Sequence, residues 1–361
     1  MATIVDVAKL AGVSPASVSH VMNGNYTQVS AATRERILAA AKQLNYRPNN
    51  IARSLRNAKS NTVAIIVEDL SVLNVGSIID GIHEYANRMG YSVQLCNLRL
   101  LTRTLSTPDP YVELFNDQLM FNNHREEFIR VIEKDVAREV DGIVYTSTHK
   151  RDVSGLITGF DKPIVYCGCY GGNRAFNTVI NNDFGASEQV VSHLIANGHR
   201  NIAVITGSTF SVVSNERLEG FKRAMAVNGC PVRNEYIRFG DWMARTGFMQ
   251  MQALMQLRTR PTAVFCFNDV MAGGALYYCQ KNKINVPHDV SIVGFDNRDI
   301  SWITYPRLTT VGVPTLDMGR TAGKMLIDAI ESKSEIPSIK LPCDLIERDS
   351  VRDLNADVMK R

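Results

Sequence analysis

From Thr62 onward, short unbroken apolar runs alternate with segments in which apolar residues recur every three or four positions. The runs, such as "TVAIIVED" at 62–69 and "NIAVITG" at 201–207, are typical of strands buried on both faces. Buried strands joined by helices form parallel sheets covered on both faces, and two such series follow one another. The pattern therefore predicts an α/β body of two Rossmann-like lobes. The periodic segments predict helices at about 77–89, 125–138, 185–196, 216–227, 245–257 and 272–281.

The first 48 residues have a different pattern, which predicts three short helices. Thr3, Ser14 and Ser30 stand where N-terminal caps are expected, and Gly12 stands where the first helix must end. Pro15 suits the first turn of the second helix. In the third helix, the apolar residues Ile37, Leu38, Ala41 and Leu44 are predicted to face the core. Two helices joined by a glycine-containing turn predict an all-α helix-turn-helix.

The positive charge of the chain is concentrated in this head. Residues 1–60 hold eight Lys or Arg and two Asp or Glu, a net charge of +6, whereas the whole chain carries +4 and the rest therefore −2. A basic head on a slightly acidic body is expected to meet a polyanion. A helical domain that binds protein is the alternative, but pattern and charge together favour DNA. The second helix of such a fold enters the major groove by its first residues, which are here Pro15, Ala16, Ser17, Ser19 and His20.

Other features of the sequence exclude several classes of protein. The seven cysteines are scattered without a C-x-x-C pair, which predicts core thiols instead of disulfides or zinc sites. The sequence contains no paired nucleophile and base, no P-loop and no metal constellation, so neither an enzyme nor a cofactor is expected. Asp6 and Lys9 interrupt the apolar N-terminus, unlike a signal peptide, and no apolar run approaches the ~20 residues of a membrane span. We therefore expect a cytoplasmic protein.

The head carries the motifs of a known family. The segment "TIVDVAKLAGVSPASVSHVMNG" at 3–24, followed by "YRPNNIARSLR" at 46–56, closely resembles the LacI/GalR family of bacterial transcription regulators. The resemblance covers essentially the whole chain. It implies a helix-turn-helix head at 1–48, a hinge helix and linker at 49–60, and an effector-binding and dimerisation core at 61–361. The predicted DNA contacts are Thr3, Ser14, Pro15, Ala16, Ser17, Ser19, His20, Arg34, Tyr46, Arg47, Asn49, Ala52, Arg53, Leu55 and Arg56.

The hinge of this family becomes a helix on operator DNA and pairs with its dimer mate. The resemblance makes Leu55 the residue that wedges into the minor groove, where an apolar side chain unstacks a base step. Arg53 and Arg56 then flank the wedge on phosphates or groove edges. A helix this short is marginal alone in water, so its order depends on DNA. A plain flexible linker is the alternative, and "NAKSN" at 57–61 fits one.

For the core, the resemblance implies the two lobes of a periplasmic-binding-protein type I fold. Lobe one is predicted at about 61–167 and 314–340, and lobe two at about 168–313 and 341–361. The chain is expected to cross between lobes near Gly168, near Pro314 and within 337–342. The segment at about 98–120 is an insertion relative to the family pattern. Long insertions are often functional, so a lid or wall on the effector cleft, or an extra lobe contact, is weighed equally with a surface hairpin.

Ligands of open α/β sheets bind beyond the carboxyl ends of the strands. This rule points to polar residues directly after strands, and the resemblance adds Arg217, Asn268 and Asp296 as effector contacts. Carboxylates and amides pair with vicinal hydroxyls, Arg donates from a rigid fork, and aromatic rings cover the face of a sugar. The predicted effector residues are Asp69, Ser147, Arg217, Phe267, Asn268, Asp296, Trp302 and Tyr305.

Simpler roles remain open for several of these residues. Asp296 with Asn297 fits a turn, and Arg217 fits a surface ion pair. Asp269, which also follows a strand, is interpreted as the cap of the next helix.

Together these features predict a homodimeric, sequence-specific repressor of carbohydrate-utilisation genes, with larger assemblies left open. Two heads read a near-palindromic operator, and a sugar or sugar derivative between the lobes changes operator affinity. Relief of repression is the commoner logic in the family, and corepression the less common. A non-sugar metabolite or a protein coregulator as the signal is the alternative. A solute-binding protein would share the body, but the basic head and the lack of a signal peptide argue against it.

Overall fold

A computed structural model divides the chain into two compact units, Met1–Asn61 and Thr62–Arg361. It describes residues 2–22, 24–46, 60–72, 75–100, 126, 128–130, 132, 140–147, 149–155, 160–172, 176–332 and 336–358. Within these ranges, no helix is both long and apolar enough to cross a membrane.

The first unit is a bundle of three helices, α1 (Ile4–Ala11), α2 (Pro15–Met22) and α3 (Ala31–Gln43). The predicted caps are confirmed. Thr3 forms a capping box with Asp6, and the Ser14 and Ser30 hydroxyls each accept a backbone N–H three residues on, at 3.2 and 3.3 Å. Gly12 adopts a left-handed φ of 66°, which ends α1 at low steric cost because glycine has no Cβ.

The core of the head joins all three helices around Val7, Val18 and Ile37. The prediction that Leu38 faces this core is wrong, because its side chain is 42% exposed. Ala40 is buried instead. At 3.6 residues per turn, Ile37, Ala40, Ala41 and Leu44 share one face, whereas Leu38 lies about 100° away from Ile37.

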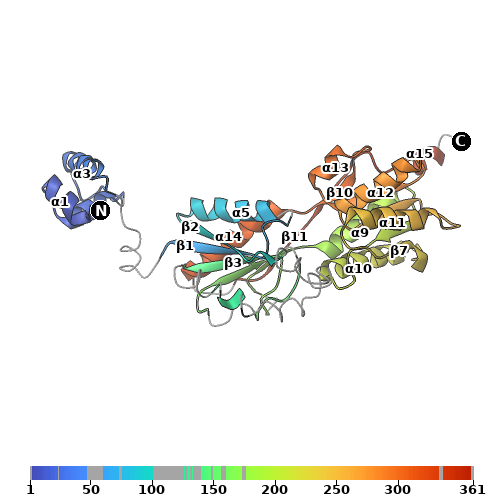
Figure 1. Cartoon of the computed structure of the whole chain (residues 1–361), viewed down its shortest axis with the longest axis horizontal. Coiled ribbons are helices and arrows are strands. Elements are labelled where there is room, and N and C mark those ends of the chain that lie inside the picture. The colour runs from blue at the N-terminus through green and yellow to red at the C-terminus, as the bar shows by residue number, and fades with distance from the viewer. Residues whose placement is uncertain are drawn as a thin grey trace. The chain divides into compact units, whose positions relative to one another are not determined.

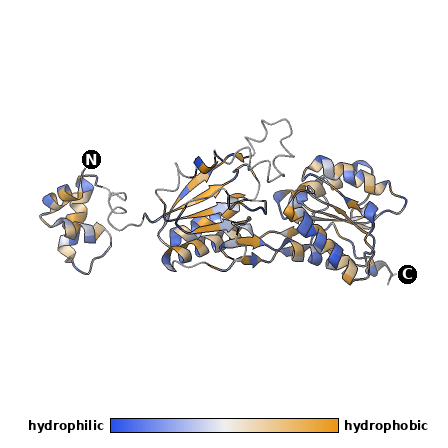
Figure 2. Cartoon of the chain, turned by 90° about the horizontal axis from the view of Figure 1, so that it is seen from below, coloured by the Kyte–Doolittle hydropathy of each residue, from blue (hydrophilic) through white to orange (hydrophobic). Residues whose placement is uncertain are grey.

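The second unit begins with a six-stranded, all-parallel sheet of order β11-β5-β4-β3-β1-β2 (Figure 1). Helices α5 (Val75–Arg88) and α14 (Thr315–Ser332) pack on one face against Ile65, while Phe128 and Ile132 cover alternate residues such as Ile66 on the other. Buried strands of this kind are mostly apolar, as Figure 2 shows. The strands are β1 (Thr62–Val67), β2 (Ser92–Asn97), β3 (Gly142–Thr146), β4 (Ile164–Cys167), β5 (Thr178–Asn181) and β11 (Ile339–Leu341).

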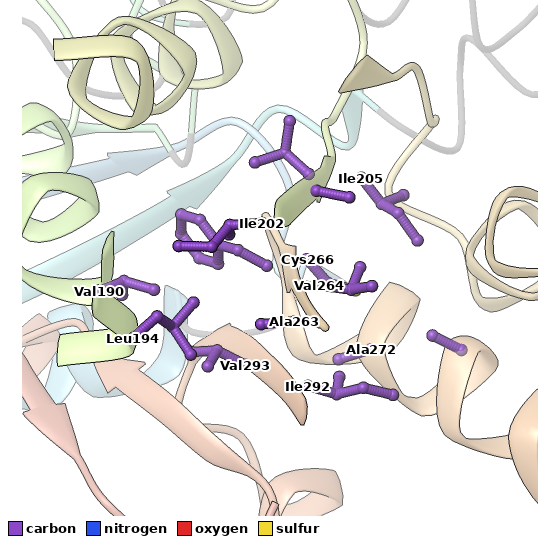
Figure 3. Packing of buried hydrophobic residues seen from close by; sticks show 14 of the residues in the cluster. Val190, Leu194, Ile202, Ile205, Ala263, Val264, Cys266, Ala272, Ile292 and Val293 are labelled. Carbon is purple, nitrogen blue, oxygen red and sulfur yellow. The ribbon is translucent and has the colours of Figure 1, made fainter. Parts of the chain in front are cut away.

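A second six-stranded sheet has the order β12-β10-β9-β8-β6-β7, parallel except for β12. Successive residues of β9 point to opposite faces, so Val293 packs with Leu194 of α9 and Ile292 lies towards Ala272 of α12 (Figure 3). The strands are β6 (Ile202–Ile205), β7 (Ile237–Arg238), β8 (Ala263–Cys266), β9 (Ser291–Asp296), β10 (Thr309–Gly312) and β12 (Asp344–Ile346). The helices are α9 (Asp183–Ala196), α10 (Val212–Val227), α11 (Ala244–Met255), α12 (Asp269–Lys281), α13 (Asp299–Ile303), α15 (Asn355–Val358) and the short η1 (Asn234–Tyr236).

The chain crosses between the two sheets three times. The first crossing lies after β5 and not near Gly168, because β5 pairs with β4 (Cys167 with Val179) and completes the first sheet. The return lies at Pro314, between β10 and α14, and the last crossing lies between β11 and β12. The described part of the glycine-rich segment after β4, residues 168–172, therefore lies within lobe one, as do residues 176–181.

Candidate DNA-binding head and effector site

The second helix of the head presents a small, uncharged surface at its start. Val18 and Val21 are buried and fix the helix on the core, while Pro15 and Ala16 are exposed. Ser17, Ser19 and His20 are part-exposed. Apolar Pro and Ala side chains can pack on thymine methyls, and hydroxyls can donate or accept at base edges. This surface suits reading of base edges more than binding of phosphates.

Several other predicted DNA contacts also have structural roles within the head. The Thr3 hydroxyl donates to the Asp6 carboxylate at 2.8 Å, and Tyr46 packs partly against the core. The Arg34 guanidinium lies 3.7 Å from the centre of the Tyr26 ring. Beyond residue 46, the predicted hinge contacts lie outside the described residues, as does the insertion after Leu100. These hinge contacts are Arg47, Asn49, Ala52, Arg53, Leu55 and Arg56.

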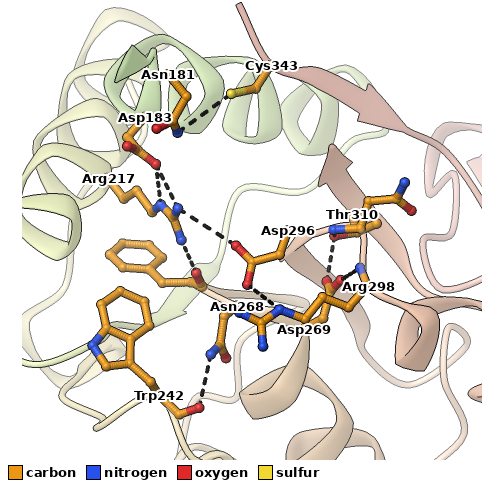
Figure 4. Close-up of polar contacts among 12 residues, drawn as sticks. Asn181, Asp183, Arg217, Trp242, Asn268, Asp269, Asp296, Arg298, Thr310 and Cys343 are labelled. Carbon is orange, nitrogen blue, oxygen red and sulfur yellow. Dashed lines mark hydrogen bonds and ion pairs between the residues drawn. The ribbon is translucent and has the colours of Figure 1, made fainter. Parts of the chain in front are cut away.

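In the second lobe, the structure brings together Arg217, Asn268 and Asp296 (Figure 4). Arg217, on α10, is only 5% exposed, so its interpretation as a surface ion pair is wrong. Its guanidinium donates to Asp183 at 2.7 Å and to the Phe267 carbonyl, and lies 3.4 Å from the centre of the Phe295 ring. One guanidinium nitrogen lies 3.9 Å from an Asp296 carboxylate oxygen. Arg217 is therefore fixed from several sides at the carboxyl ends of β8 and β9.

Asp296 ends β9 in an unusual backbone conformation. Its φ is 107°, and Asn297 follows at 54°, so the pair forms a turn, and this turn places the Asp296 carboxylate beside Arg217. Positive φ values at residues other than glycine are strained and cluster at functional sites. The Arg298 side chain lies 3.1 Å from the Asp296 carboxylate. Burial raises the pKa of Asp296, against the opposing effect of Arg217 and Arg298.

Asn268 and Trp242 form the other side of this group. The Asn268 carboxamide caps α12 by accepting from the Met271 N–H at 2.8 Å, and it donates to the Trp242 carbonyl at 2.9 Å. A carboxamide has a further N–H and a further lone pair beyond these two bonds. Trp242 has a φ of 72°, and its indole N–H is buried with no acceptor among the residues that the structure describes.

Trp242 was not predicted as a site residue. Its ring lies so close to Gly207 that a Cβ there would overlap it, and its centre lies 5.9 Å from the Arg217 guanidinium. Gly207 follows β6 and Trp242 follows β7, so the rule that ligands bind beyond the carboxyl ends of strands also applies to these two residues. The sequence does not predict that Trp242 packs on Gly207 or lies beside Arg217. Only the tertiary structure shows these two contacts.

The aromatic residues that were predicted have other environments. Phe267 is fully buried and packs on the Phe265 ring at 5.1 Å, so the prediction that its ring covers a ligand is wrong. It contributes its carbonyl oxygen to Arg217 instead. Trp302, on α13, is 59% exposed beside the guanidinium of Arg307 at 5.1 Å, and Tyr305 is 97% exposed.

Asp269 has a different role from the predicted one. Asn268 is the cap of α12, and the Asp269 carboxylate reaches across the sheet edge instead. It accepts from the Arg298 backbone N–H at 2.7 Å and from the Thr310 hydroxyl at 2.5 Å. These bonds hold the turn that contains Asp296. Burial raises the pKa of Asp269 to about 7.

Lobe one contributes a second buried polar group at the ends of β1 and β3. The Ser147 hydroxyl donates to the Glu68 carboxylate at 2.7 Å, and the Tyr145 hydroxyl donates to it at 3.2 Å. Asp69 accepts from the backbone N–H and the hydroxyl of Ser71 at 2.8 and 2.5 Å. Glu68, which is not among the predicted residues, accepts the hydrogen bonds from both the Ser147 and the Tyr145 hydroxyls.

Lys150 connects lobe one with the start of lobe two. Its ammonium lies 2.6 Å from Asp183 and 2.6 Å from Glu216, and it donates to the Asn181 carbonyl at 2.8 Å. Burial alone would lower the pKa of Lys150, but the two carboxylates outweigh it and raise the pKa. Burial likewise opposes ionisation of Asp183, yet Arg217 and Lys150 hold its pKa below the ordinary value. No local pattern in the sequence predicts this contact.

Comparison with known proteins assigns the family. Residues 3–49 match the family of bacterial regulatory proteins named lacI, and residues 191–351 match the periplasmic binding protein-like domain. The HTH-type transcriptional repressor PurR of Actinobacillus pleuropneumoniae serotype 3 (strain JL03) is 34% identical over 359 residues, which are 98% of this chain and 100% of the relative. The chain belongs to the LacI family. PurR of Vibrio cholerae serotype O1 (strain M66-2) is 32% identical over 355 residues, 98% of this chain and 99% of that protein.

Solved structures of LacI-family regulators extend this similarity to the fold. The Lac repressor dimer bound to operator and the anti-inducer ONPF has a TM-score of 0.78 at 26% identity, covering 97% of this chain and 99% of that one. The complex of the transcriptional regulator CelR with cellobiose has a TM-score of 0.65 at 28% identity, covering 97% and 100%. The predicted family and fold are confirmed. This LacI-family chain is a DNA-binding transcriptional repressor and not an enzyme.

Proposed function

We propose that this LacI-family repressor binds a near-palindromic operator as a homodimer, and that a sugar or sugar derivative at the group around Arg217 controls its affinity. The observation that carries the effector site is the convergence of Arg217, Asn268 and Asp296 beside Trp242 at the carboxyl ends of the second sheet. Two-fold symmetry of the dimer would match two half-sites of DNA. The effector acts through its different affinities for the two states of the body.

The chemistry of the group suits a polyhydroxylated ligand. The Asp296 carboxylate accepts hydrogen bonds, and the Asn268 amide both donates and accepts, which matches a pair of vicinal hydroxyls. The buried indole N–H of Trp242 calls for an acceptor such as a sugar oxygen, and its ring offers an apolar face. The similar CelR structure is a complex with a sugar, cellobiose.

A non-sugar metabolite is the second candidate, because the similar full-length sequences are PurR repressors and not sugar regulators by name. A thermal-shift screen against monosaccharides, oligosaccharides, sugar phosphates and nucleobases separates the two. A ligand that binds only the folded chain raises the melting temperature by mass action. We expect a sugar to do so and Asp296→Asn to remove most of the shift. Asp349→Asn, which alters an exposed pair with Arg307, is the matched control. Stabilisation by nucleobases alone would overturn the sugar proposal.

The homodimer is supported by an apolar surface on lobe two. The Tyr277 ring of α12 lies 5.7 Å from that of Phe248 on α11, and Gly273, one turn earlier on α12, meets Ile300 of α13. Tyr277, Met249 and Ile303 are all exposed large apolar side chains on these adjoining helices. Exposed apolar side chains on neighbouring helices commonly mark a protein interface, and a second copy of the chain is the occupant that the proposed two-fold operator would require.

Charge introduced into this surface should weaken self-association. We expect Tyr277→Asp to raise the dimer dissociation constant by about tenfold or more, because it buries an unpaired carboxylate. Val227→Asp, at the exposed end of α10, is the control and should leave the dimer intact. Sedimentation equilibrium measures both constants, and equal values for the two variants would place the interface elsewhere.

A further inference from the structure

Lys150 is the most deeply buried lysine that the structure describes, and the proposed effector chemistry does not use it. It follows β3 in lobe one, is 3% exposed, and directs its ammonium at one group at the end of lobe one and two groups on helices of lobe two. These are the carbonyl of Asn181 at the end of β5, the carboxylate of Asp183 at the start of α9 and the carboxylate of Glu216 on α10. No other described lysine has contacts of this kind.

Asp183 divides its two carboxylate oxygens between Lys150 and the effector site. One oxygen lies 2.6 Å from the Lys150 ammonium, and the other accepts from Arg217 at 2.7 Å. Asp183 is fully buried, so bulk solvent does not screen either ion pair. The position of the Asp183 carboxylate therefore depends on Lys150, and the position of the Arg217 guanidinium depends on Asp183.

The cations and carboxylates around Arg217 are equal in number, because Arg298 also lies 3.1 Å from Asp296. Lys150 and Arg217 face the three carboxylates of Asp183, Glu216 and Asp296. Without Lys150, Arg217 is the cation left at Asp183, while Asp296 keeps both Arg217 and Arg298. Removing one partner from a buried ion pair leaves an uncompensated charge, which the surroundings relieve by moving. Arg217 is the cation that still contacts Asp183, so it is the group expected to move.

We infer that Lys150 is a positioning residue that holds Arg217 in the effector site through Asp183, and thereby makes the site on lobe two depend on contact with lobe one. The inference rests on the proposed role of Arg217 in effector binding. Its physical basis is that Lys150 follows a strand of the first sheet, whereas Asp183 and Glu216 lie on helices of lobe two, so these ion pairs join the two lobes in this arrangement. An effector that engages Arg217 is then coupled to that arrangement.

Tryptophan fluorescence tests the positioning without any effector. The chain has two tryptophans, so Trp302→Phe leaves Trp242, beside Arg217, as the sole emitter. In that background we expect Lys150→Met to shift Trp242 emission and to increase its quenching by acrylamide, because Arg217 leaves the ring. Lys150→Arg should restore the parent signal in part. Lys222→Met, which breaks an exposed pair with Glu219 on the same helix as Arg217, should not change it.

The remaining variants separate positioning from general damage. Glu216→Gln removes the more exposed carboxylate, leaves the Lys150–Asp183 bridge, and should keep the parent spectrum. If Lys150→Met does not fold, by circular dichroism, Lys150→Gln takes the same test, because it keeps a donor for the Asn181 carbonyl without the charge. The same quenching in the Lys150 and Lys222 variants would overturn the inference.

Effector binding supplies the second readout. With any sugar from the thermal-shift screen that binds the Trp302→Phe parent, Lys150→Met should weaken binding by about tenfold or more. Unchanged affinity would refute the positioning role and leave the sugar proposal standing. If no sugar stabilises the parent, the sugar proposal fails, and the Trp242 spectra still decide the role of Lys150.

Discussion

Single residues hold the proposed effector site in a strained backbone conformation. Asp296 and Trp242, both at positive φ, are kept in place by their neighbours: Asp269 fixes the turn after β9, and Asn268 holds the Trp242 carbonyl. A strained backbone persists only where its surroundings determine it. Asp269 gives this support while its pKa is raised to about 7, so part of its stabilising effect depends on pH.

The pH dependence of Asp269 can be isolated by Asp269→Asn. A carboxyl whose pKa rises from 3.8 to about 7 on folding favours the protonated folded state, so its contribution to stability falls as pH rises from about 4 to 7. Asn can still accept from the Arg298 N–H and donate to the Thr310 hydroxyl. We expect the free energy of unfolding of the variant, relative to the parent, to rise by roughly 3 kcal/mol from pH 5 to pH 8.

Chemical denaturation across that range measures this difference. Asp349→Asn is the control, because its partner Arg307 lowers the pKa of Asp349 and places its titration below the range. A difference between Asp269→Asn and the parent that stays constant from pH 5 to pH 8 would contradict the expected titration.

At the scale of elements, close helix packing shapes the first lobe. Helices α5 and α14 cross so closely that a Cβ at Gly81 would overlap the Leu316 carbonyl, and one at Gly319 would overlap the Ile78 carbonyl. Both helices then cover the face of the first sheet around Ile65. The sequence marks neither glycine as special, because an isolated glycine in a helix pattern usually signals only lower propensity.

Gly81→Ala should destabilise the body, whereas Gly76→Ala should not. Both residues lie in α5, but the space around Gly76 is open. Alanine is the better helix former by about 1 kcal/mol, so Gly76→Ala is expected to stabilise slightly. Overpacking at Gly81 should instead cost roughly 1–3 kcal/mol. Urea unfolding measures both, and a stabilising Gly81→Ala would show that the two helices can separate without loss.

At the scale of the whole molecule, we expect different parts of the head to supply base-sequence preference and affinity for phosphates. The start of α2 is uncharged, and most of the basic residues of the head lie outside that helix. Phosphate contacts supply affinity that depends on salt, while base contacts supply sequence preference. We therefore expect modest discrimination by α2 itself, with further specificity from the hinge.

Two substitutions in the head should have different effects on operator binding. Arg34→Ala should weaken all DNA sequences alike and lower the slope of log affinity against log salt by about one contact. A double substitution of Pro15 and Ala16 should change base preference in the outer half-site with little change in that slope. Arg223→Ala, on α10 of the body, is the control. Equal salt slopes for Arg34→Ala and the parent would remove Arg34 from the phosphate contacts.

The sequence by itself determined the features that depend on neighbours a few residues apart. The caps at Thr3, Ser14 and Ser30, the turn at Gly12 and the alternation of strands and helices all follow from local periodicity and capping chemistry. The family motifs added Arg217, Asn268 and Asp296, which the structure brings together.

The tertiary structure alone decided contacts between distant segments. It assigned β5 to the first sheet through pairing with β4. It showed that Asp269 supports the Asp296 turn instead of capping α12, and that Trp242 lies beside Arg217. The Lys150–Asp183 bridge joins residues on two different lobes. Such contacts depend on sheet register and on the burial of charge, which arise only when strands far apart in the chain have come together.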